Sequence, residues 1–243
     1  MSLLVLLFLL ALVAFLYASV GHGGASGYLA VMALLGVAPV LMKSSALVMN
    51  LAVSLFSFIG FYRAGFFRFK LFFPFALSSI PCSFIGAMYV LPDSIYKKIL
   101  AVCILISIAR LLYQFDKSNK ENNAIPWPIG LLVGAIIGII SGMIGIGGGI
   151  LLSPLMLLMR WGNLKETAAV SALFIFVNSV SGLLGAIAKG TFVMSQDLVW
   201  SVLATVVGGA VGAYLGSHKF NMPTLKYLLA LGLTIACLKL FFT

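Results

Sequence analysis

The chain has 243 residues, of which 63% are hydrophobic and 8% are charged, and its formal net charge is +10. Soluble domains are usually about one quarter charged, so a soluble fold of this size could not cover so much apolar surface. The 15 Lys and Arg residues are scattered between apolar segments and form no basic stripe, so nucleic acid is not expected as a partner. The mean hydropathy of +1.20 indicates that the chain lies in a lipid bilayer.

Ten apolar segments are expected, and uninterrupted runs such as LLVLLFLLALVAFL predict helices, because the strands of a β-barrel would alternate polar and apolar residues. The expected segments are 2–20, 26–42, 44–62, 71–91, 95–114, 128–142, 149–160, 166–188, 196–216 and 224–242. The first is interpreted as a membrane segment and not as a cleavable signal, since no basic region precedes it. The predicted fold class is an all-α polytopic membrane protein.

The two halves of the chain resemble each other on either side of the polar stretch QFDKSNKENNAIPWP. The run VGHGGASGYLAVMALLG parallels IGIGGGILLSPLMLLM, and KKILAVCILISIARLL later parallels KYLLALGLTIACLKLF. This duplication predicts residues 1–114 as a first membrane repeat, 115–127 as a cytoplasmic linker and 128–243 as a second membrane repeat. Because each five-segment repeat would cross the membrane an odd number of times, the repeats are expected to be inverted, as in many secondary transporters.

The distribution of basic residues predicts which side of the membrane each loop occupies. Alternating the loops between two faces puts ten Lys and Arg residues on one face and five on the other. Cytoplasmic loops carry such an excess, so the first face is predicted to be cytoplasmic. The linker would then lie inside the cell, and both termini would lie outside it.

Five glycines interrupt the apolar sequence between Gly142 and Gly149. Segments 128–142 and 149–160 are shorter than the roughly 20 residues that span a bilayer, so we expect two partial helices that meet at this break. Unwound backbone at this depth is tolerated where it is buried in protein or lines a cavity, and glycine lets free N–H groups approach a ligand closely. The second partial helix then presents its N-terminus, where an anion can bind.

The stretch GHGGAS, residues 21–26, repeats this device in the first half. Glycines also serve close helix packing, but a cluster in both halves favours glycine-broken helices whose N-termini form one central anion site. A bulky replacement of Gly148 is expected to abolish binding without unfolding the protein. The candidate substrate-binding residues are His22, Gly23, Gly24, Ser26, Asn50, Gly147, Gly148, Gly149, Ser171 and Asn178.

Each polar side chain among these candidates has a structural alternative. His22 lies within the first break, where it could donate to the anion, titrate and couple transport to protons, or only bond a helix end. Asn50 and Ser171 are interpreted as equivalent positions of the two repeats, and they, like Asn178, could contact the substrate or a neighbouring helix. Ser26 could contact the anion, although capping the second segment is the simpler expectation.

The acidic residues fall in loops or at segment ends, so a carboxylate relay within the membrane is not expected. No catalytic residue, metal site or cofactor is predicted. An interior without carboxylates suits an anionic ligand, because carboxylates would repel it. These features therefore predict a small anion as the ligand.

The motifs GHGGASGYLA, GMIGIGGGILLSPLMLL with the following KETAAVSALF, and the RAG and AKG turns resemble the TauE/SafE sulfite-exporter family, also called the TSUP permeases. The second-half pattern of this family is matched by Gly145, Gly147, Gly148, Gly149, Pro154 and Ser171. The first half departs from the pattern, since His22 takes the variable position and Asn50 stands where a serine would fall. The resemblance implies a permease of the bacterial cytoplasmic membrane for sulfur-containing anions such as sulfite, sulfoacetate and other organosulfonates.

Two other classes of function share some of these features. A passive anion channel would use the same site without alternating access. The stretch GASG, residues 24–27, matches the G-x-S-G pattern of intramembrane serine proteases with Ser26 as nucleophile, but the chain holds only two histidines to act as base. We therefore expect a transporter and no enzyme. The sequence leaves open the particular anion, the coupled ion (protons or sodium) and whether the protein forms homo-oligomers.

Overall fold

The structure is a computed structural model that describes residues 3–19, 23–112, 123–193 and 196–218, together with 233, 234, 237 and 238. Every regular element in these residues is an α-helix, which confirms the all-helical class. The helices are α1 (Leu3–Ser19), α2 (Ala25–Leu34), α3 (Pro39–Arg63), α4 (Phe69–Met88), α5 (Asp93–Leu112), α6 (Trp127–Ile144), α7 (Gly149–Leu158), α8 (Leu164–Ala188) and α9 (Gln196–His218). Among the described residues, five helices are long and apolar enough to cross a membrane, namely α3, α4, α6, α8 and the Leu198–Leu215 part of α9.

The helices follow the expected segments closely, with two differences. The segment expected at 26–42 ends earlier, because α2 stops at Leu34 and Pro39 occupies the first turn of α3, where its missing N–H does no harm. The break expected at 142–149 is narrower, because α6 continues to Ile144 and includes Gly142. The segment expected at 224–242 and residues 113–122 of the linker region lie outside the described residues, apart from the four named above.

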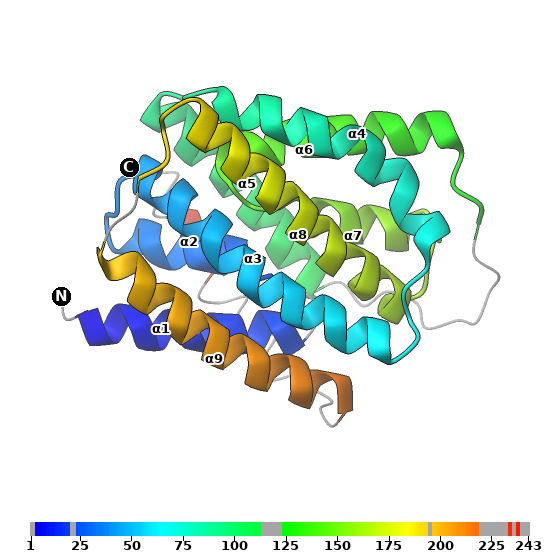
Figure 1. Ribbon diagram of the computed structural model, residues 1–243, viewed down its shortest axis with the longest axis horizontal. Helices are drawn as coiled ribbons and strands as arrows, with labels where there is room; N and C mark the ends of the chain where they lie inside the picture. Colours follow the sequence, from blue (N-terminus) through cyan, green and yellow to red (C-terminus); the bar gives the residue numbers. More distant parts are fainter. Residues whose placement is uncertain are drawn as a thin grey trace.

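Two helix pairs form opposite edges of the bundle. Figure 1 shows α1 beside α9 along one edge and α4 beside α6 along the other, with α3 and α8 crossing between them. Gly134, Gly138 and Gly142 of α6 lie directly against the backbone of α4, and Gly208 and Gly212 of α9 lie against the backbone of α1. These glycines therefore serve the close packing that small residues allow between membrane helices.

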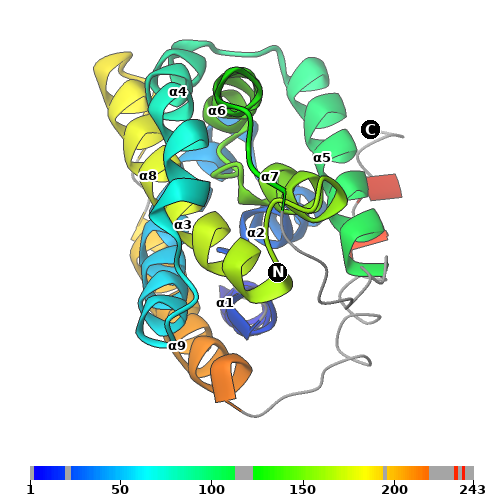
Figure 2. The same cartoon turned by 90° about the vertical axis from the view of Figure 1, so that its right-hand side faces the viewer.

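The two short helices occupy the centre of the molecule. Helices α2 and α7 have ten residues each, which corresponds to about 15 Å, or half of the hydrocarbon core. Figure 2 places both between the α3 and α8 side of the bundle and α5. Tyr28 and Leu29 of α2 are fully buried, as are Leu152 and Met156 of α7. Two partial helices thus begin inside the protein and not at its surface.

The start of α8 is fixed by a capping box. The side chain of Asn163 accepts hydrogen bonds from the backbone N–H groups of Lys165 and Glu166, and the Glu166 carboxylate accepts one from the N–H of Asn163. Glu166 also forms an ion pair with Arg68, which precedes α4. This arrangement satisfies the first N–H groups of the helix and joins α4 to α8 at one end of the bundle.

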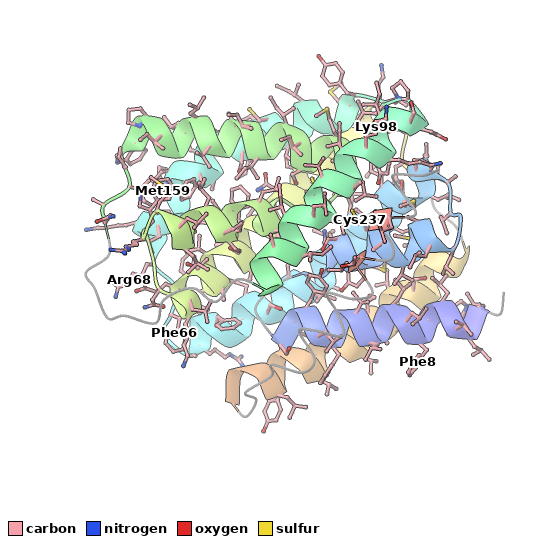
Figure 3. The ribbon with its side chains drawn as sticks, turned by 180° about the vertical axis from the view of Figure 1, so that it is seen from behind. Phe8, Phe66, Arg68, Lys98, Met159 and Cys237 are labelled. Atoms are coloured by element: carbon pink, nitrogen blue, oxygen red, sulfur yellow. The ribbon has the colours of Figure 1, made fainter. Side chains whose placement is uncertain are left out.

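Basic residues lie at both ends of the bundle. Figure 3 shows Arg68 at one end and Lys98 at the opposite end, and α1 begins at the end that carries Lys98. The distribution of basic residues in the sequence predicts that Arg68 and Lys98 face opposite sides of the membrane. The assignment of these two ends to the cytoplasmic and outer sides stays a prediction.

Candidate functional site

Glycines in the left-handed region precede both central helices. Gly24 caps α2 with a φ of 87°, and Gly148 caps α7 with a φ of 77°, after Gly147 with a φ of 71°. Glycine adopts these angles without the penalty that a Cβ would bring. No side chain caps either helix N-terminus, so the first N–H groups of both helices are available to another acceptor. The turns before α2 and α7 are called the first and second glycine turns below.

The two glycine turns meet on one pair of side chains. A methyl group added at Gly23 would lie 2.9 Å from Cγ2 of Ile175 and 3.0 Å from Oδ1 of Asn50. A methyl group added at Gly147 would lie 2.6 Å from the same Cγ2 and 3.3 Å from Nδ2 of Asn50. Asn50 comes from α3 and Ile175 from α8, so two segments 124 positions apart (147 − 23) approach the same point between these helices.

Polar atoms at this point have no hydrogen-bond partner among the described residues. Nδ2 and Oδ1 of Asn50 and Oγ of Ser179 are all unpaired, and both side chains are fully buried. The methyl position on Gly147 lies 3.1 Å from the Ser179 oxygen. An unpaired buried polar group costs about 1–3 kcal/mol, and such groups are normally satisfied by a ligand or by ordered water. The second glycine turn, Asn50 and Ser179 therefore form a polar centre in an apolar bundle.

The other glycines among the candidates have different neighbours. A methyl group on Gly24 would meet the ring of Tyr28, and one on Gly149 would meet Ile175. A methyl group on Gly148 would lie 2.8 Å from Ile137 and from Phe174, which belong to an apolar cluster. A bulky side chain at Gly148 would therefore strain the backbone and that cluster. The expectation that its replacement spares the fold does not agree with this geometry.

Two polar candidates are engaged with neighbouring helices. The hydroxyl of Ser26 lies 2.7 Å from that of Tyr17 on α1, so Ser26 joins two helices and does not cap α2. The hydroxyl of Ser171 lies 2.7 Å from that of Ser153, which donates to the carbonyl of Gly149. These two serines support the helices that carry the glycine turns, and neither is placed at the point where the turns meet.

Asn178 occupies an intermediate position. Its Nδ2 donates to the carbonyl of Phe174 one turn earlier in α8, over 2.8 Å, while its Oδ1 has no partner among the described residues. The side chain is fully buried. His22 lies outside the described residues, next to Gly23, so its expected role stays a prediction.

Ile175 and Ser179 also lie against the second glycine turn, although neither is among the residues expected from the sequence. The sequence pairs Asn50 with Ser171 as equivalent positions, whereas Asn50 is the twelfth residue of α3 and the twelfth residue of α8 is Ile175. Counting four further in each helix reaches Ser54 and Ser179. Both helices have 25 residues in the structure, so this register becomes visible once their bounds are known.

Lys43 lies near the second break but is committed to the backbone. Its Nζ donates to the carbonyl of Ala87 near the end of α4, over 2.9 Å, and its own backbone lies close to Gly145, which ends α6. A cation beside the C-terminus of a helix is favoured by the helix dipole. The Lys43 side chain thus bonds the end of α4, and its backbone packs against the residue that ends α6.

Comparison with known proteins agrees with this architecture. Residues 6–240 match the family described as sulfite exporter TauE/SafE. A probable membrane transporter protein, y4hK, of Sinorhizobium fredii is 34% identical over 236 residues, which cover 94% of each chain. A second probable membrane transporter protein, YunE of Bacillus subtilis, is 28% identical over 106 residues, which cover 43% of this chain and 37% of that protein. No solved structure gives a significant match.

An all-helical bundle with several apolar spans and buried half-length helices defines a multi-pass membrane protein. The match over nearly the whole chain identifies its class as a membrane transporter. The chain belongs to the sulfite exporter TauE/SafE family.

Proposed function

We propose that this protein is a secondary transporter of small anions, and that the anion binds where the two glycine turns meet. The N–H groups at the start of α2 and α7 and the amide of Asn50 hold it there. The observation that carries the proposal is the pair of unpaired, fully buried amide atoms of Asn50, which lie against Gly23 and Gly147. Family membership supports sulfur-containing oxyanions or organosulfonates, such as sulfite or sulfoacetate, as the substrate class.

Two helix N-termini suit an anion without any fixed cation. The helix dipole concentrates positive potential at the first turn, and free N–H groups point along the axis toward the ligand. Asn50 adds a neutral donor from α3. In a buried, low-dielectric site, these dipoles act more strongly than they would in water.

The helix contacts support two inverted repeats. Helix α1 packs on α9, and α6, the corresponding first helix of the second half, packs on α4. Helices α2 and α7 pack on α3 and α8, and α3 contacts α9 as α8 contacts α4. Each of these contacts thus has a counterpart with the halves exchanged. Rocking of one repeat against the other would expose the central site alternately to the two sides of a bacterial cytoplasmic membrane, with both termini outside.

The first test is the thermal stability of the detergent-purified protein with sulfite, thiosulfate, sulfate, sulfoacetate, taurine, phosphate and chloride at matched ionic strength. A ligand at one hundred times its Kd stabilises the native state by about 2.7 kcal/mol, which raises the melting temperature. Selective stabilisation by a sulfur oxyanion or a sulfonate is the expected result. Equal melting temperatures with every anion would contradict the proposal.

The variant Gly23→Ala locates the site. Gly23 is not in the left-handed region, so alanine brings no backbone strain, but its methyl group would enter between Asn50 and Ile175. We expect the anion-dependent rise in melting temperature to disappear. Gly60→Ala is the matched control, because a methyl group there meets nothing within 4 Å. Equal responses of the two variants would contradict this position for the site.

A passive channel is the second candidate function, and the flux of labelled sulfite in proteoliposomes distinguishes a channel from a carrier. A carrier that alternates access exchanges labelled sulfite faster when unlabelled sulfite is present on the opposite side. A channel shows no such acceleration. We expect acceleration. The protease alternative is disfavoured, because among the described residues the Ser26 hydroxyl contacts the hydroxyls of Tyr17 and Ser107 and not a histidine.

A further inference from the structure

Two residues of α8 face the second glycine turn, one helical turn apart. A methyl group on Gly147 would meet Ile175 at 2.6 Å and the Ser179 hydroxyl at 3.1 Å. We propose that Ser179 is a further ligand-binding residue and that Ile175 determines the size of anion the site accepts. This inference rests on the proposed function and assigns the selectivity of the same site.

Ser179 differs from the other serines that neighbour it. Ser181, two residues on, donates to the carbonyl of Ile80 on α4, and Ser54, which has the same place in α3, donates to the carbonyl of Asn50. Those hydroxyls join helices or bond their own helix. The hydroxyl of Ser179 is fully buried and has no partner among the described residues, although it faces the second glycine turn.

Ser179 and Asn50 approach that turn from two helices. Their polar atoms lie 3.1 and 3.3 Å from the same methyl position on Gly147. A serine hydroxyl and an asparagine NH₂ group are both donors, and an oxyanion offers several oxygen acceptors at once. A hydroxyl from α8 and an amide from α3 can therefore bind separate oxygens of one anion, while the helix N-termini face it from the turns.

Ile175 closes the apolar side of this space. A methyl group added at Gly23, Gly147 or Gly149 would in each case lie against Ile175, so this side chain contacts both glycine turns. Ile175 is 3% exposed. A β-branched side chain has few rotamers and cannot easily fold away. An anion that binds at this point has to share its volume with Ile175, so a compact oxyanion such as sulfite displaces this side chain less than an anion with a substituent on the sulfur. Ile175 therefore favours inorganic oxyanions over substituted sulfonates.

The test of Ile175 compares the Kd of sulfite with that of sulfoacetate. Removing methylene-sized groups from a pocket changes discrimination by about tenfold or more, so Ile175→Ala is expected to reduce the preference for sulfite by about tenfold. Ile175→Val, a smaller change that keeps the branched shape, is expected to change it less. Ile104→Ala is the control, since Ile104 is equally buried but belongs to the α5 side of the core.

The test of Ser179 compares Ser179→Ala with Ser181→Ala. We expect Ser179→Ala to weaken sulfite binding about tenfold while the unliganded melting temperature is unchanged or higher, because the hydroxyl has no partner to lose. Ser181→Ala should lower the melting temperature and leave the Kd unchanged, because it removes a bond between helices. Ser179→Thr, which keeps the hydroxyl, should retain most of the affinity.

The outcomes separate this inference from the proposed function. If wild-type protein binds sulfite, but Ile175→Ala and Ile175→Val keep its anion preference and Ser179→Ala keeps its affinity, this inference is overturned and the anion site stands. If wild-type protein binds no anion of either kind, both are overturned. A reduced preference in either Ile175 variant, together with weaker binding in Ser179→Ala, supports the inference.

Discussion

Asn50 is the residue on which the account of the site depends. It is fully buried at the middle of a membrane-crossing helix, and neither end of its amide is paired among the described residues. Buried side-chain amides usually bond a neighbouring helix or their own helix, as the Nδ2 of Asn178 does with the carbonyl of Phe174. An amide that faces two glycine turns without a partner is suited to a ligand that is exchanged during function.

The variant Asn50→Leu has opposite expected effects on stability and binding. Leucine has the same branched outline of heavy atoms, although it is larger, and it leaves no unpaired polar atom, so the free energy of unfolding without ligand should rise by about 1 kcal/mol. Stabilisation by anions should be lost in the same variant. Thermal melting with and without sulfite measures both effects. A lower melting temperature combined with normal anion binding would contradict the role given to Asn50.

Glycine has two distinct uses in the elements of this fold. In α6 the residues Gly134, Gly138 and Gly142 allow the backbone of α4 to approach, and this is a packing function. In the glycine turns, Gly24, Gly147 and Gly148 take positive φ angles directly before α2 and α7 begin. Gly142 and Gly148 belong to one glycine cluster in the sequence, but Gly142 packs against α4 whereas Gly148 caps the start of α7.

Placing a methyl group in the α4–α6 contact should destabilise the protein. Gly138→Ala puts its Cβ against the backbone of Ser79, which cannot move aside as a flexible side chain would. Overpacking of this kind costs about 1–3 kcal/mol. We expect a lower melting temperature than for Gly60→Ala, whose methyl group meets nothing. Equal melting temperatures for these two variants would show that the close contact is not tight.

The capping box at the start of α8 makes a separate prediction. Asn163→Ala leaves two backbone N–H groups without their acceptor and should lower stability by about 1 kcal/mol. Asn163→Ser keeps a side-chain acceptor and should be close to wild type. Chemical or thermal unfolding in detergent compares the two. Equal loss in both variants would indicate that α8 does not depend on this cap.

At the scale of the whole molecule, the account requires a definite orientation in the membrane. Arg68 and Lys98 lie at opposite ends of the bundle (Figure 3), and the excess of basic residues predicts that the end with Arg68 is cytoplasmic. The reciprocal packing of α1 on α9 and of α6 on α4 agrees with inverted halves. Orientation and inversion are independent of the chemistry of the site.

Cysteine labelling tests the orientation. Lys98→Cys and Lys70→Cys, each in a chain whose three native cysteines are replaced by alanine, place one exposed thiol at each end. A membrane-impermeant thiol reagent added to intact cells should label the first variant and should label the second only after permeabilisation. The reverse pattern would show that the topology is opposite to the predicted one. Labelling of both variants in intact cells would contradict the prediction that the two ends face opposite sides of the membrane.

Much of the fold could be predicted because hydropathy and glycine position act locally. The starts of α6 and α7, and the break before each short helix, follow from residues at those positions. The register of α8 against α3 depends on packing between distant segments, and no local pattern encodes it. Gly23, Gly147 and Asn50 are expected from the sequence and lie together, whereas Ile175 and Ser179 lie beside them without a local signal, and Ser26 and Ser171 bond neighbouring helices.

The central claim is that one anion binds where both glycine turns meet Asn50. The most direct measurement is the anomalous scattering of crystals of the protein grown with selenite, the heavier analogue of sulfite, with its sulfur-containing methionines retained. The account predicts a selenium peak within hydrogen-bond distance of the Asn50 side chain, between Gly23 and Gly147. A peak at another place in the bundle, with none at this point, would contradict it.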